Sequence, residues 1–262
     1  MDKPIINYII GTYFGHRRME EMNGLELCDL HFKQLTRLKH GINKIYVAAS
    51  GKDFNPVIYD YIQKYPNLNI EVIINEDNKG FAFGSWDIAL KQTIDEADYS
   101  VITEDDYIPL MDNFDQIFLD YFTNDNVAYV CQLLTCESSP SISKGAELCQ
   151  GIIKHSAFKE SGGFQIDGYG YCQVVEGSQG MFLKNIIEHG YEVKDTIDKY
   201  RSFYDRTTKI WLYGNKKDPE IFRPIECCKY NCDAYVEKHD VNYIIEYTEN
   251  KELNLLQKNE EI

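Results

Sequence analysis

The 262-residue sequence has no apolar run long enough to span a membrane and no excess of basic residues. A membrane-spanning helix needs about 20 consecutive apolar residues, and residues 1–15 (MDKPIINYIIGTYFG) lack the pattern of a signal peptide. Acidic residues outnumber basic ones by 42 to 27, and the formal charge of −15 repels phosphate backbones and anionic headgroups. We therefore expect a cytoplasmic protein with no transmembrane segment and no nucleic-acid partner.

The sequence also lacks paired CxxC motifs, although it contains eight cysteines. Most of them lie in apolar stretches, where a thiol behaves as a small hydrophobic group. The one cluster, Cys227 to Cys232, has no CxxC partner nearby, and His239 is the only later histidine. We expect reduced, buried cysteines and no zinc site.

The first half of the chain alternates strand-like and helix-like stretches, and a hydrophobic content of 44% is enough for a sizeable core. Strands are expected at residues 5–10, 44–49, 70–74 and 99–103. The first helix should end at Gly41, the second should begin at Asn55 and Pro56, and the third should open near Gly84. This alternation predicts an α/β fold with a mostly parallel sheet flanked by helices.

The composition changes after Thr135. A short helix from Asp112 and a strand at residues 127–134 precede a loop-like segment at 137–145 (ESSPSISKG), and a helix at 179–189 follows. We therefore divide the chain into two halves of one compact domain, 1–135 and 136–262.

Three consecutive carboxylates, Glu104, Asp105 and Asp106, directly follow the fourth expected strand. In an open parallel sheet, ligands bind beyond the carboxyl ends of the strands. Adjacent carboxylates repel one another, and a bound Mn²⁺ or Mg²⁺ relieves that repulsion and can bridge a diphosphate. A solvated acidic turn is the alternative interpretation, but the position after the strand favours a metal site.

In this setting the sequence resembles the glycosyltransferases of GT-A fold, in particular the inverting family 2 enzymes. The acids at 104–106 are similar to their DxD motif, in an ExD form, and are followed by a proline. Residues 78–85 (NKGFAFGS) resemble their N-x-G-x-x-x-A-R-N segment. Residues 161–164 (SGGF), Glu176 and the Gly-Tyr pair at 190–191 resemble the GGF stretch, the ED pair and the helix end of the family, in the same order.

The resemblance implies an enzyme that moves a sugar from a nucleotide-diphosphate sugar to a glycan or other hydroxyl acceptor. Residues 1–135 would bind the donor and residues 136–262 the acceptor. Glu104 and Asp106 are the implied metal ligands. The implied nucleotide-sugar-binding residues are Thr12, Tyr13, Arg17, Ser50, Asp53, Asn78, Gly80, Gly84 and Asp105.

An inverting transferase needs a carboxylate that takes the proton of the acceptor hydroxyl. Glu176 is the expected base, and Asp167 is the alternative, either as base or as a ligand of acceptor hydroxyls. Trp86 and Gly163 are expected on the acceptor side, Trp86 through stacking of its ring on a sugar. By analogy with some GT-A enzymes, His239 is a candidate for a further metal ligand.

The sequence departs from the family pattern in two places. Ser85 and Trp86 stand where the family has arginine and asparagine, so another group has to bind the diphosphate. Glu176 is a single carboxylate where the family has a pair, which leaves open a non-catalytic binding module. A sugar-nucleotide nucleotidyltransferase is the other alternative, although residues 11–18 only loosely imitate its glycine-rich loop. Donor sugar, nucleobase, acceptor and stereochemistry stay open.

Overall fold

The computed structural model describes residues 3–14, 24–52, 54–77, 79–135, 145–166, 181–196, 201–205, 210–214 and 219–223. Within these ranges the strands and helices are, in chain order, β1 (Ile6–Tyr13), α1 (Gly24–Arg37), β2 (Ile42–Ser50), α2 (Ile58–Ile62), β3 (Ile70–Asn75), α3 (Phe81–Thr93), β4 (Tyr99–Glu104), β5 (Ile108–Pro109), α4 (Phe114–Leu119), β6 (Val127–Thr135), β7 (Gly145–Lys154), α5 (His155–Glu160), α7 (Met181–Glu188), β8 (Glu192–Asp195), β9 (Arg201–Asp205), β10 (Ile210–Gly214) and β11 (Pro219–Arg223). No helix in this part of the chain is long and apolar enough to cross a bilayer.

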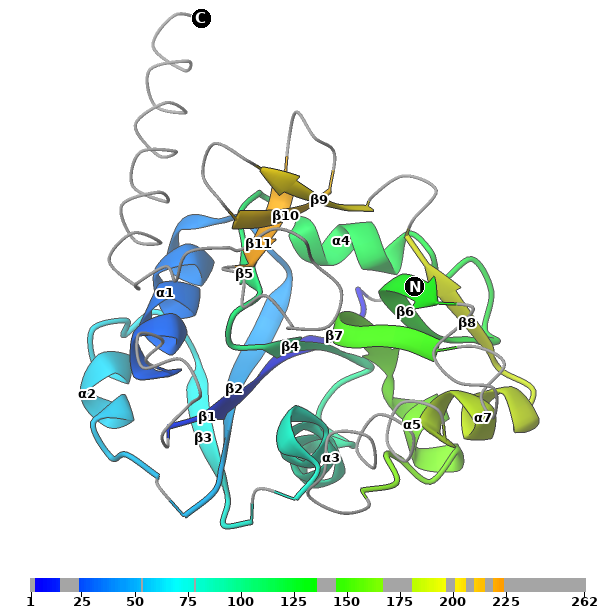
Figure 1. The fold of residues 1–262 in the computed structure, drawn as a ribbon, viewed down its shortest axis with the longest axis horizontal. Helices are drawn as coiled ribbons and strands as arrows, with labels where there is room; N and C mark the ends of the chain where they lie inside the picture. The colour runs from blue at the N-terminus through cyan, green and yellow to red at the C-terminus, as the bar shows by residue number, and fades with distance from the viewer. Residues whose placement is uncertain are drawn as a thin grey trace, which may run out of the picture.

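The main sheet has, among the described residues, seven strands in the order β3-β2-β1-β4-β7-β6-β8 (Figure 1). β1 pairs in parallel with β2 and β4, and β3 pairs in parallel with β2. The last residues of these strands are in register, because Ser50 pairs with both Tyr13 and Asn75, and Glu104 pairs with Gly11. The carboxyl ends of β1 to β4 therefore meet at one edge, which confirms the expected α/β fold with a mostly parallel sheet.

β7 is the antiparallel member of the sheet and lies between β4 and β6, while β8 runs parallel to β6. The expected division after residue 135 therefore falls inside this sheet, since β6 precedes it and β7 and β8 follow it. β7 was not expected from the sequence, in which Gly151, the seventh of its 10 residues, weakens the strand signal. The glycine is needed there, because a Cβ at Gly151 would lie 2.3 Å from the Tyr129 hydroxyl.

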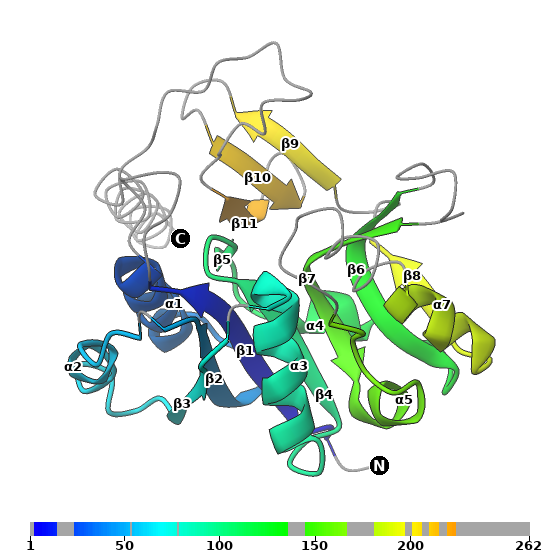
Figure 2. The ribbon, with the colours of Figure 1, turned by 60° about the horizontal axis from the view of Figure 1, so that its bottom comes forward.

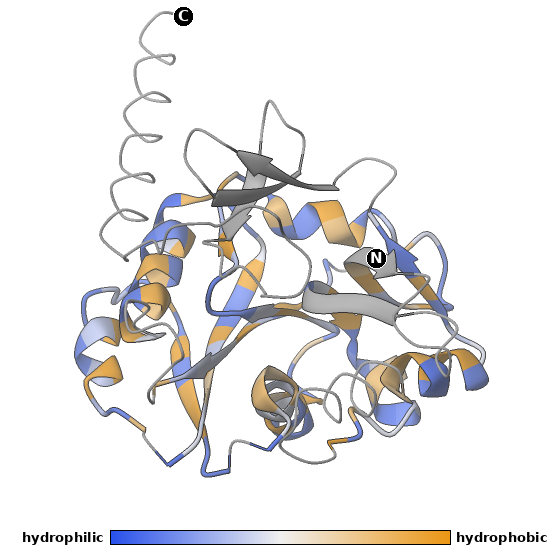
Figure 3. Cartoon of the chain, in the orientation of Figure 1, coloured by the Kyte–Doolittle hydropathy of each residue, from blue (hydrophilic) through white to orange (hydrophobic). Residues whose placement is uncertain are grey.

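Helices cover both faces of the main sheet. α1, α2 and α4 pack on one face, and α3, α5 and α7 pack on the other (Figure 1). β1 alternates between the two cores, as the period of two in a strand requires: Tyr8 and Ile10 belong to the first core and Ile9 to the second. α7 turns its hydrophobic side, which includes Phe182 and Ile186, toward the sheet (Figure 3).

A small second sheet has four strands in the described ranges, in the order β5-β11-β10-β9. Its strand β5 begins four residues after Glu104, the last residue of β4, and pairs with β11. Figure 2 shows the small sheet on the side of the main sheet where β4 leads into β5. The carboxyl edge of the main sheet is therefore the edge next to the second sheet.

One expected helix end was wrong, and another was right in part. α1 ends at Arg37, and Gly41 does not cap it; instead the Gly41 N–H donates to Asp115 Oδ2 at 2.9 Å. Asn55 does bind a free backbone amide, as expected, because its Oδ1 accepts the Val57 N–H at 3.1 Å. The helix α2 itself begins at Ile58, so Pro56 lies in the turn before the helix and not at its first position.

Candidate active site

The acidic segment forms a tight turn at the carboxyl end of β4. The Tyr107 N–H donates to the Glu104 carbonyl at 3.1 Å, so Asp105 and Asp106 occupy the middle of the turn. Glu104 and Asp106 are half-buried, whereas Asp105 is only 4% exposed. The Asp105 side chain is therefore buried, whereas Glu104 and Asp106 are partly exposed as residues, with Asp106 Oδ1 itself shielded from solvent.

Asp105 attaches the turn to β1. Thr12 Oγ1 donates to Asp105 Oδ2 at 2.5 Å, and the Asp105 N–H donates to the Gly11 carbonyl at 3.2 Å. Thr12 is as buried as Asp105. These two side chains bind each other and fix the acidic turn, and their contact with the nucleotide stays a prediction.

A second attachment comes from α1, through a histidine that the sequence analysis did not single out. His31 Nε2 lies 3.0 Å from the Asp105 carbonyl oxygen, and His31 Nδ1 lies 3.0 Å from the Tyr8 hydroxyl. A carbonyl oxygen only accepts, so Nε2 carries the proton and Nδ1 accepts from Tyr8. The available signal was its spacing, since His31 falls on the same face of α1 as the buried residues Cys28 and Leu35.

Both members of this buried pair are uncharged at neutral pH. Burial lowers the pKa of His31 to about 4, although the hydrogen bond to the Asp105 carbonyl and the negative charge of Asp106 oppose the shift. Burial also raises the pKa of Tyr8 far above its ordinary value. A neutral imidazole and a neutral phenol therefore link α1 and β1 to the acidic turn.

The loops after β1 and β2 carry aromatic side chains that the sequence analysis also missed. The rings of Phe14 and Phe54 lie 6.1 Å apart, and the rings of Phe54 and Tyr59 lie 6.1 Å apart. Phe14 and Phe54 are half-buried, as is the expected donor ligand Tyr13. Ser50 is buried beside Thr12, with its Oγ 3.5 Å from the Thr12 carbonyl oxygen. The sequence signal that could have identified these packed rings was an aromatic residue in each of the loops that follow two neighbouring strands.

The segment between β3 and α3 depends on both glycines of the NKGFAFGS motif. Gly80 has φ +78° and is followed by Phe81 with φ +49°, so two successive residues adopt left-handed conformations. A Cβ on Gly84 would lie 2.0 Å from the Lys79 carbonyl oxygen. α3 starts at Phe81, three residues before the expected position, and Gly80 provides no side-chain cap for its amides. Gly80 and Gly84 therefore shape the backbone at the edge where the donor is expected.

The expectation that Trp86 contacts the acceptor is corrected. The ring is fully buried, its indole N–H donates to the Thr103 carbonyl at 3.1 Å, and it packs edge-on against Phe83. No face of the indole is left for a sugar. Trp86 was read as a binding residue because aromatic rings stack on sugars, but here it fills the core between α3 and β4.

Gly163 also lies inside the fold. A Cβ at Gly163 would lie 2.9 Å from the Phe158 ring, and the next N–H, that of Phe164, donates to Asp87 Oδ1 at 3.2 Å. Asp87 is buried on α3 and pairs with Lys91 at 2.6 Å. Burial raises the pKa of Asp87, and the positive charge of Lys91 opposes that shift. The SGGF stretch is thus fastened to α3, and Gly163 allows this close contact instead of presenting a surface to an acceptor.

Several predicted residues lie outside the described ranges: Arg17, Asp53, Asn78, Asp167, Glu176, the cluster from Cys227 to Cys232, and His239. Across the described residues, no three His, Cys, Asp or Glu side chains are grouped so that they could hold a metal ion. The acidic turn is therefore no closed metal cage. Cys28 and Cys131 are buried and are not disulfide-bonded, as expected for these two cysteines.

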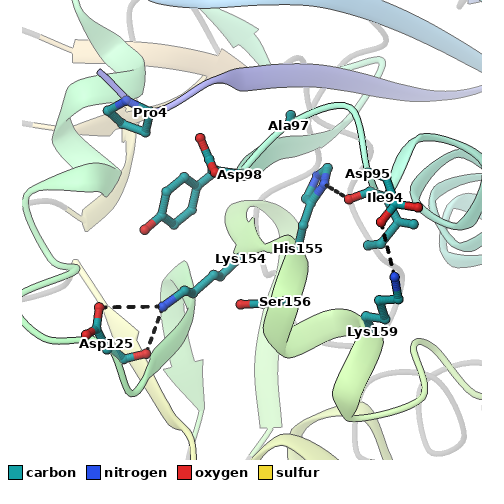
Figure 4. A pocket seen from close by; sticks show the side chains of 11 residues that line it. Pro4, Ile94, Asp95, Ala97, Asp98, Asp125, Lys154, His155, Ser156 and Lys159 are labelled. Atoms are coloured by element: carbon teal, nitrogen blue, oxygen red, sulfur yellow. Dashed lines mark hydrogen bonds and ion pairs between the residues drawn. The ribbon is translucent and has the colours of Figure 1, made fainter. Parts of the chain in front are cut away.

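A cavity of about 550 Å³ lies far from the acidic turn, at the edge where β1 and β4 begin (Figure 4). Its charged groups bind one another: Lys159 pairs with Asp95 at 3.1 Å, and Lys154 donates to the Asp125 carbonyl at 2.9 Å. His155 is bonded at both ring nitrogens, to Ser100 and to the Ile94 carbonyl. These five side chains are engaged with the protein itself, and the carboxyl edge of the sheet remains the candidate site.

No protein-family model and no curated protein matches the sequence. Solved structures do match. The mannosyltransferase PcManGT from Pyrobaculum calidifontis, in complex with GDP-Man and Mn²⁺, has a TM-score of 0.51 and 12% identity over 74% of this chain. A 4-diphosphocytidyl-2C-methyl-D-erythritol synthase from Anaerococcus prevotii has a TM-score of 0.47 and 13% identity, over 74% of this chain and 86% of that chain. The catalytic domain of Drosophila β1,4-galactosyltransferase 7, in complex with xylobiose, has a TM-score of 0.43 and 15% identity, over 94% of this chain and 79% of that chain.

The likeness to PcManGT establishes the fold. The described chain has the mostly parallel sheet flanked by helices of the GT-A glycosyltransferases, as the sequence analysis expected. This chain spans 55% of the PcManGT chain. At 12% identity the likeness concerns the arrangement of strands and helices, and activity has to be argued from the residues of the site.

Proposed function

We propose that this protein is a metal-dependent glycosyltransferase that moves a sugar from a nucleotide-diphosphate sugar to a hydroxyl acceptor, with inversion at the anomeric carbon. The observation that carries the proposal is the acidic turn: Glu104 and Asp106 are half-exposed at the carboxyl end of a central strand in a GT-A fold. PcManGT, which shares the fold, was solved with a nucleotide sugar and Mn²⁺. We also propose that the protein acts in the cytoplasm.

Glu104 and Asp106 would hold Mn²⁺ or Mg²⁺ through hard carboxylate oxygens, the donor type that these ions prefer. The two carboxylates fit such an ion only in part, since the described residues offer no third ligand beside them. The oxygens of the diphosphate and water would complete the coordination. When bound, the cation neutralises charge on the diphosphate leaving group.

The amino end of α3 is our candidate for the diphosphate-binding role that an arginine fills in the family. α3 has 13 residues, follows the carboxyl end of β3 and begins without a side-chain cap, so its first amides point toward the edge with partial positive charge. Arg17 and Asn78 are further candidates for the same diphosphate. Phe14 and Phe54 would offer aromatic surface to the nucleobase, with Tyr13, Ser50 and Asp53 contributing polar contacts.

The proton of the acceptor hydroxyl would pass to Glu176 as the attacking oxygen forms its bond to the anomeric carbon. Asp167 is the alternative base or an acceptor ligand. The fastening of Phe164 to Asp87 supports this half of the proposal, because it fixes the chain three residues before Asp167. The acceptor would be a glycan or another molecule with a free hydroxyl.

Product analysis tests the function. The protein is incubated with Mn²⁺ and a panel of nucleotide sugars, with and without simple sugar acceptors, and nucleoside diphosphate release is measured. A parallel reaction supplies nucleoside triphosphates with sugar 1-phosphates, and pyrophosphate is measured. The proposal predicts diphosphate release that stops when EDTA is added. Pyrophosphate release alone would identify a nucleotidyltransferase, and binding without either product would identify a non-catalytic module.

A further inference from the structure

We propose that His31 is a positioning residue that sets the divalent-cation affinity of the acidic turn by holding the Asp105 carbonyl in place. The inference rests on the proposed role of Glu104 and Asp106 as metal ligands. His31 itself touches neither the ion nor the substrate. It acts through one backbone group, and it lies outside the three motifs named above, at residues 78–85, 104–106 and 161–191.

The Asp105 carbonyl is well placed to orient the metal-binding side chain that follows it. The Asp105 carbonyl belongs to the peptide unit that joins Asp105 to Asp106, and a peptide unit is planar and rigid. A hydrogen bond to its oxygen, here 3.0 Å from His31 Nε2, therefore fixes the orientation of the whole unit. Together with the φ angle of Asp106, that orientation sets the direction in which the Asp106 side chain leaves the backbone.

The donor to this carbonyl is rigidly held. His31 and Tyr8 are both fully buried, and their rings lie 5.8 Å apart at 56°. The Tyr8 hydroxyl donates to His31 Nδ1 at 3.0 Å, which leaves Nε2–H directed at the carbonyl. A ring held at both nitrogens and surrounded by the core of α1 and β1 cannot rotate away. The turn is thus attached to two elements, to β1 through Thr12 and to α1 through His31.

Electrostatic repulsion also acts on the turn. Glu104 and Asp106 have like charges. Without restraint, moving the two carboxylates apart lowers the free energy of the turn. A cation then has to bring them together again, which weakens its binding. Restraints on the turn remove part of that reorganisation, as groups that orient metal ligands do in other sites, where their loss lowers metal affinity about 10- to 100-fold.

A matched pair of variants tests the proposal, because the two amide side chains imitate different nitrogens of the imidazole. His31→Gln places an amide nitrogen near the position of Nε2, so it keeps a donor for the Asp105 carbonyl and loses the partner of Tyr8. His31→Asn places its amide near Nδ1, so it keeps a partner for Tyr8 and loses the donor to Asp105. Each variant gives up one of two buried hydrogen bonds, so both should lose a similar amount of stability.

The measurement is the affinity for Mn²⁺ alone, from the loss of the electron paramagnetic resonance signal of the free ion. Sucrose, which favours compact states, keeps destabilised variants folded, and urea unfolding gives their stabilities. We expect His31→Asn to weaken Mn²⁺ binding about 10- to 100-fold and His31→Gln to stay within about threefold of the wild type. Tyr8→Phe, which keeps the bond to Asp105, should lose stability with little change in Mn²⁺ affinity.

The outcomes separate this inference from the proposed function. If Asp106→Asn abolishes Mn²⁺ binding while His31→Asn binds as the wild type does, the metal site stands and the role of His31 is overturned. The role of His31 is also overturned if Mn²⁺ affinity simply follows stability in all three variants, His31→Asn, His31→Gln and Tyr8→Phe. Such a result would indicate a general structural role. If Asp106→Asn binds Mn²⁺ as the wild type does, both the metal site and this inference fail.

Discussion

Replacing Gly84 by alanine sets two physical effects of opposite sign against each other. Gly84 is the fourth residue of α3, and in an ordinary helix interior Gly→Ala stabilises by about 1 kcal/mol. Here the added Cβ would lie 2.0 Å from the Lys79 carbonyl oxygen, a distance that no real Cβ contact shows. The carbonyl belongs to the backbone of the β3–α3 connection, so the connection itself has to move by roughly 1 Å or more to reach ordinary contact distance.

We expect this overpacking to exceed the helix preference and to destabilise the protein by about 1 to 3 kcal/mol. Urea unfolding with a constant slope gives the difference. Gly162→Ala is the matched control, because a Cβ there meets nothing within 4 Å and only the left-handed φ of +82° opposes it. Gly84→Ala should also weaken nucleotide binding, whereas Gly162→Ala should not. An alanine variant at position 84 as stable as the wild type would refute the close contact.

Three further predictions follow from the described residues and the proposed mechanism. Trp86→Phe should lose about 2 kcal/mol of stability, because it removes the hydrogen bond to Thr103 and leaves a cavity. The KM for the acceptor should stay unchanged, and a selective rise in that KM would show that Trp86 does contact the acceptor. Burial lowers the pKa of His155, so below about pH 6.5 the unfolded state binds more protons than the folded state. The stability of the wild type should therefore be fully present above that pH and decline as the pH falls. The thermal midpoint of His155→Gln should decline less steeply with falling pH, and parallel slopes for the two proteins would contradict this. Glu176→Gln should lower the transfer rate about 10²- to 10⁴-fold with donor affinity nearly unchanged. If this variant transferred sugar at a near wild-type rate while Asp167→Asn was inactive, Asp167 and not Glu176 would be the base.

The sequence predicted the parallel part of the sheet well, because buried parallel strands are short, nearly continuous apolar runs. β3 and β4 each extend one residue beyond the expected bounds, and β1 extends to Tyr13, three residues further. That extension matters, since it places Thr12 in a strand beside Asp105. The start of α3 was missed because Phe81 has a left-handed φ of +49°, which local propensity does not anticipate for phenylalanine.

Features that depend on contacts between distant residues were not accessible from the sequence. Trp86 is in the core because Gly11 leaves room for it: a Cβ there would lie 2.7 Å from the indole nitrogen. Pro109 belongs to a strand because β11 pairs with it from more than a hundred residues away. The role of His31 likewise requires knowing that α1 packs beneath the acidic turn.

The place of the acidic turn in the fold was predicted from the sequence, and the different burial of its three acids was not. The three acids do lie at the carboxyl edge of a central strand, as their place in the sequence indicated. Burial then divides them into a structural acid, Asp105, and two half-exposed ones, Glu104 and Asp106, a division that a run of three carboxylates cannot reveal. The roles of Glu176 and Asp167 stay predictions.

Calorimetric titration of a panel of nucleoside diphosphates tests most directly whether the acidic turn holds a metal-bound diphosphate. Each titration is made with Mn²⁺ and with EDTA, on the wild type and on Asp106→Asn, which keeps the size of the side chain and removes its charge. The account predicts that at least one diphosphate binds to the wild type with Mn²⁺ and that this binding is lost both in EDTA and in Asp106→Asn. Equal affinity with Mn²⁺ and with EDTA, or unchanged binding by Asp106→Asn, would contradict it.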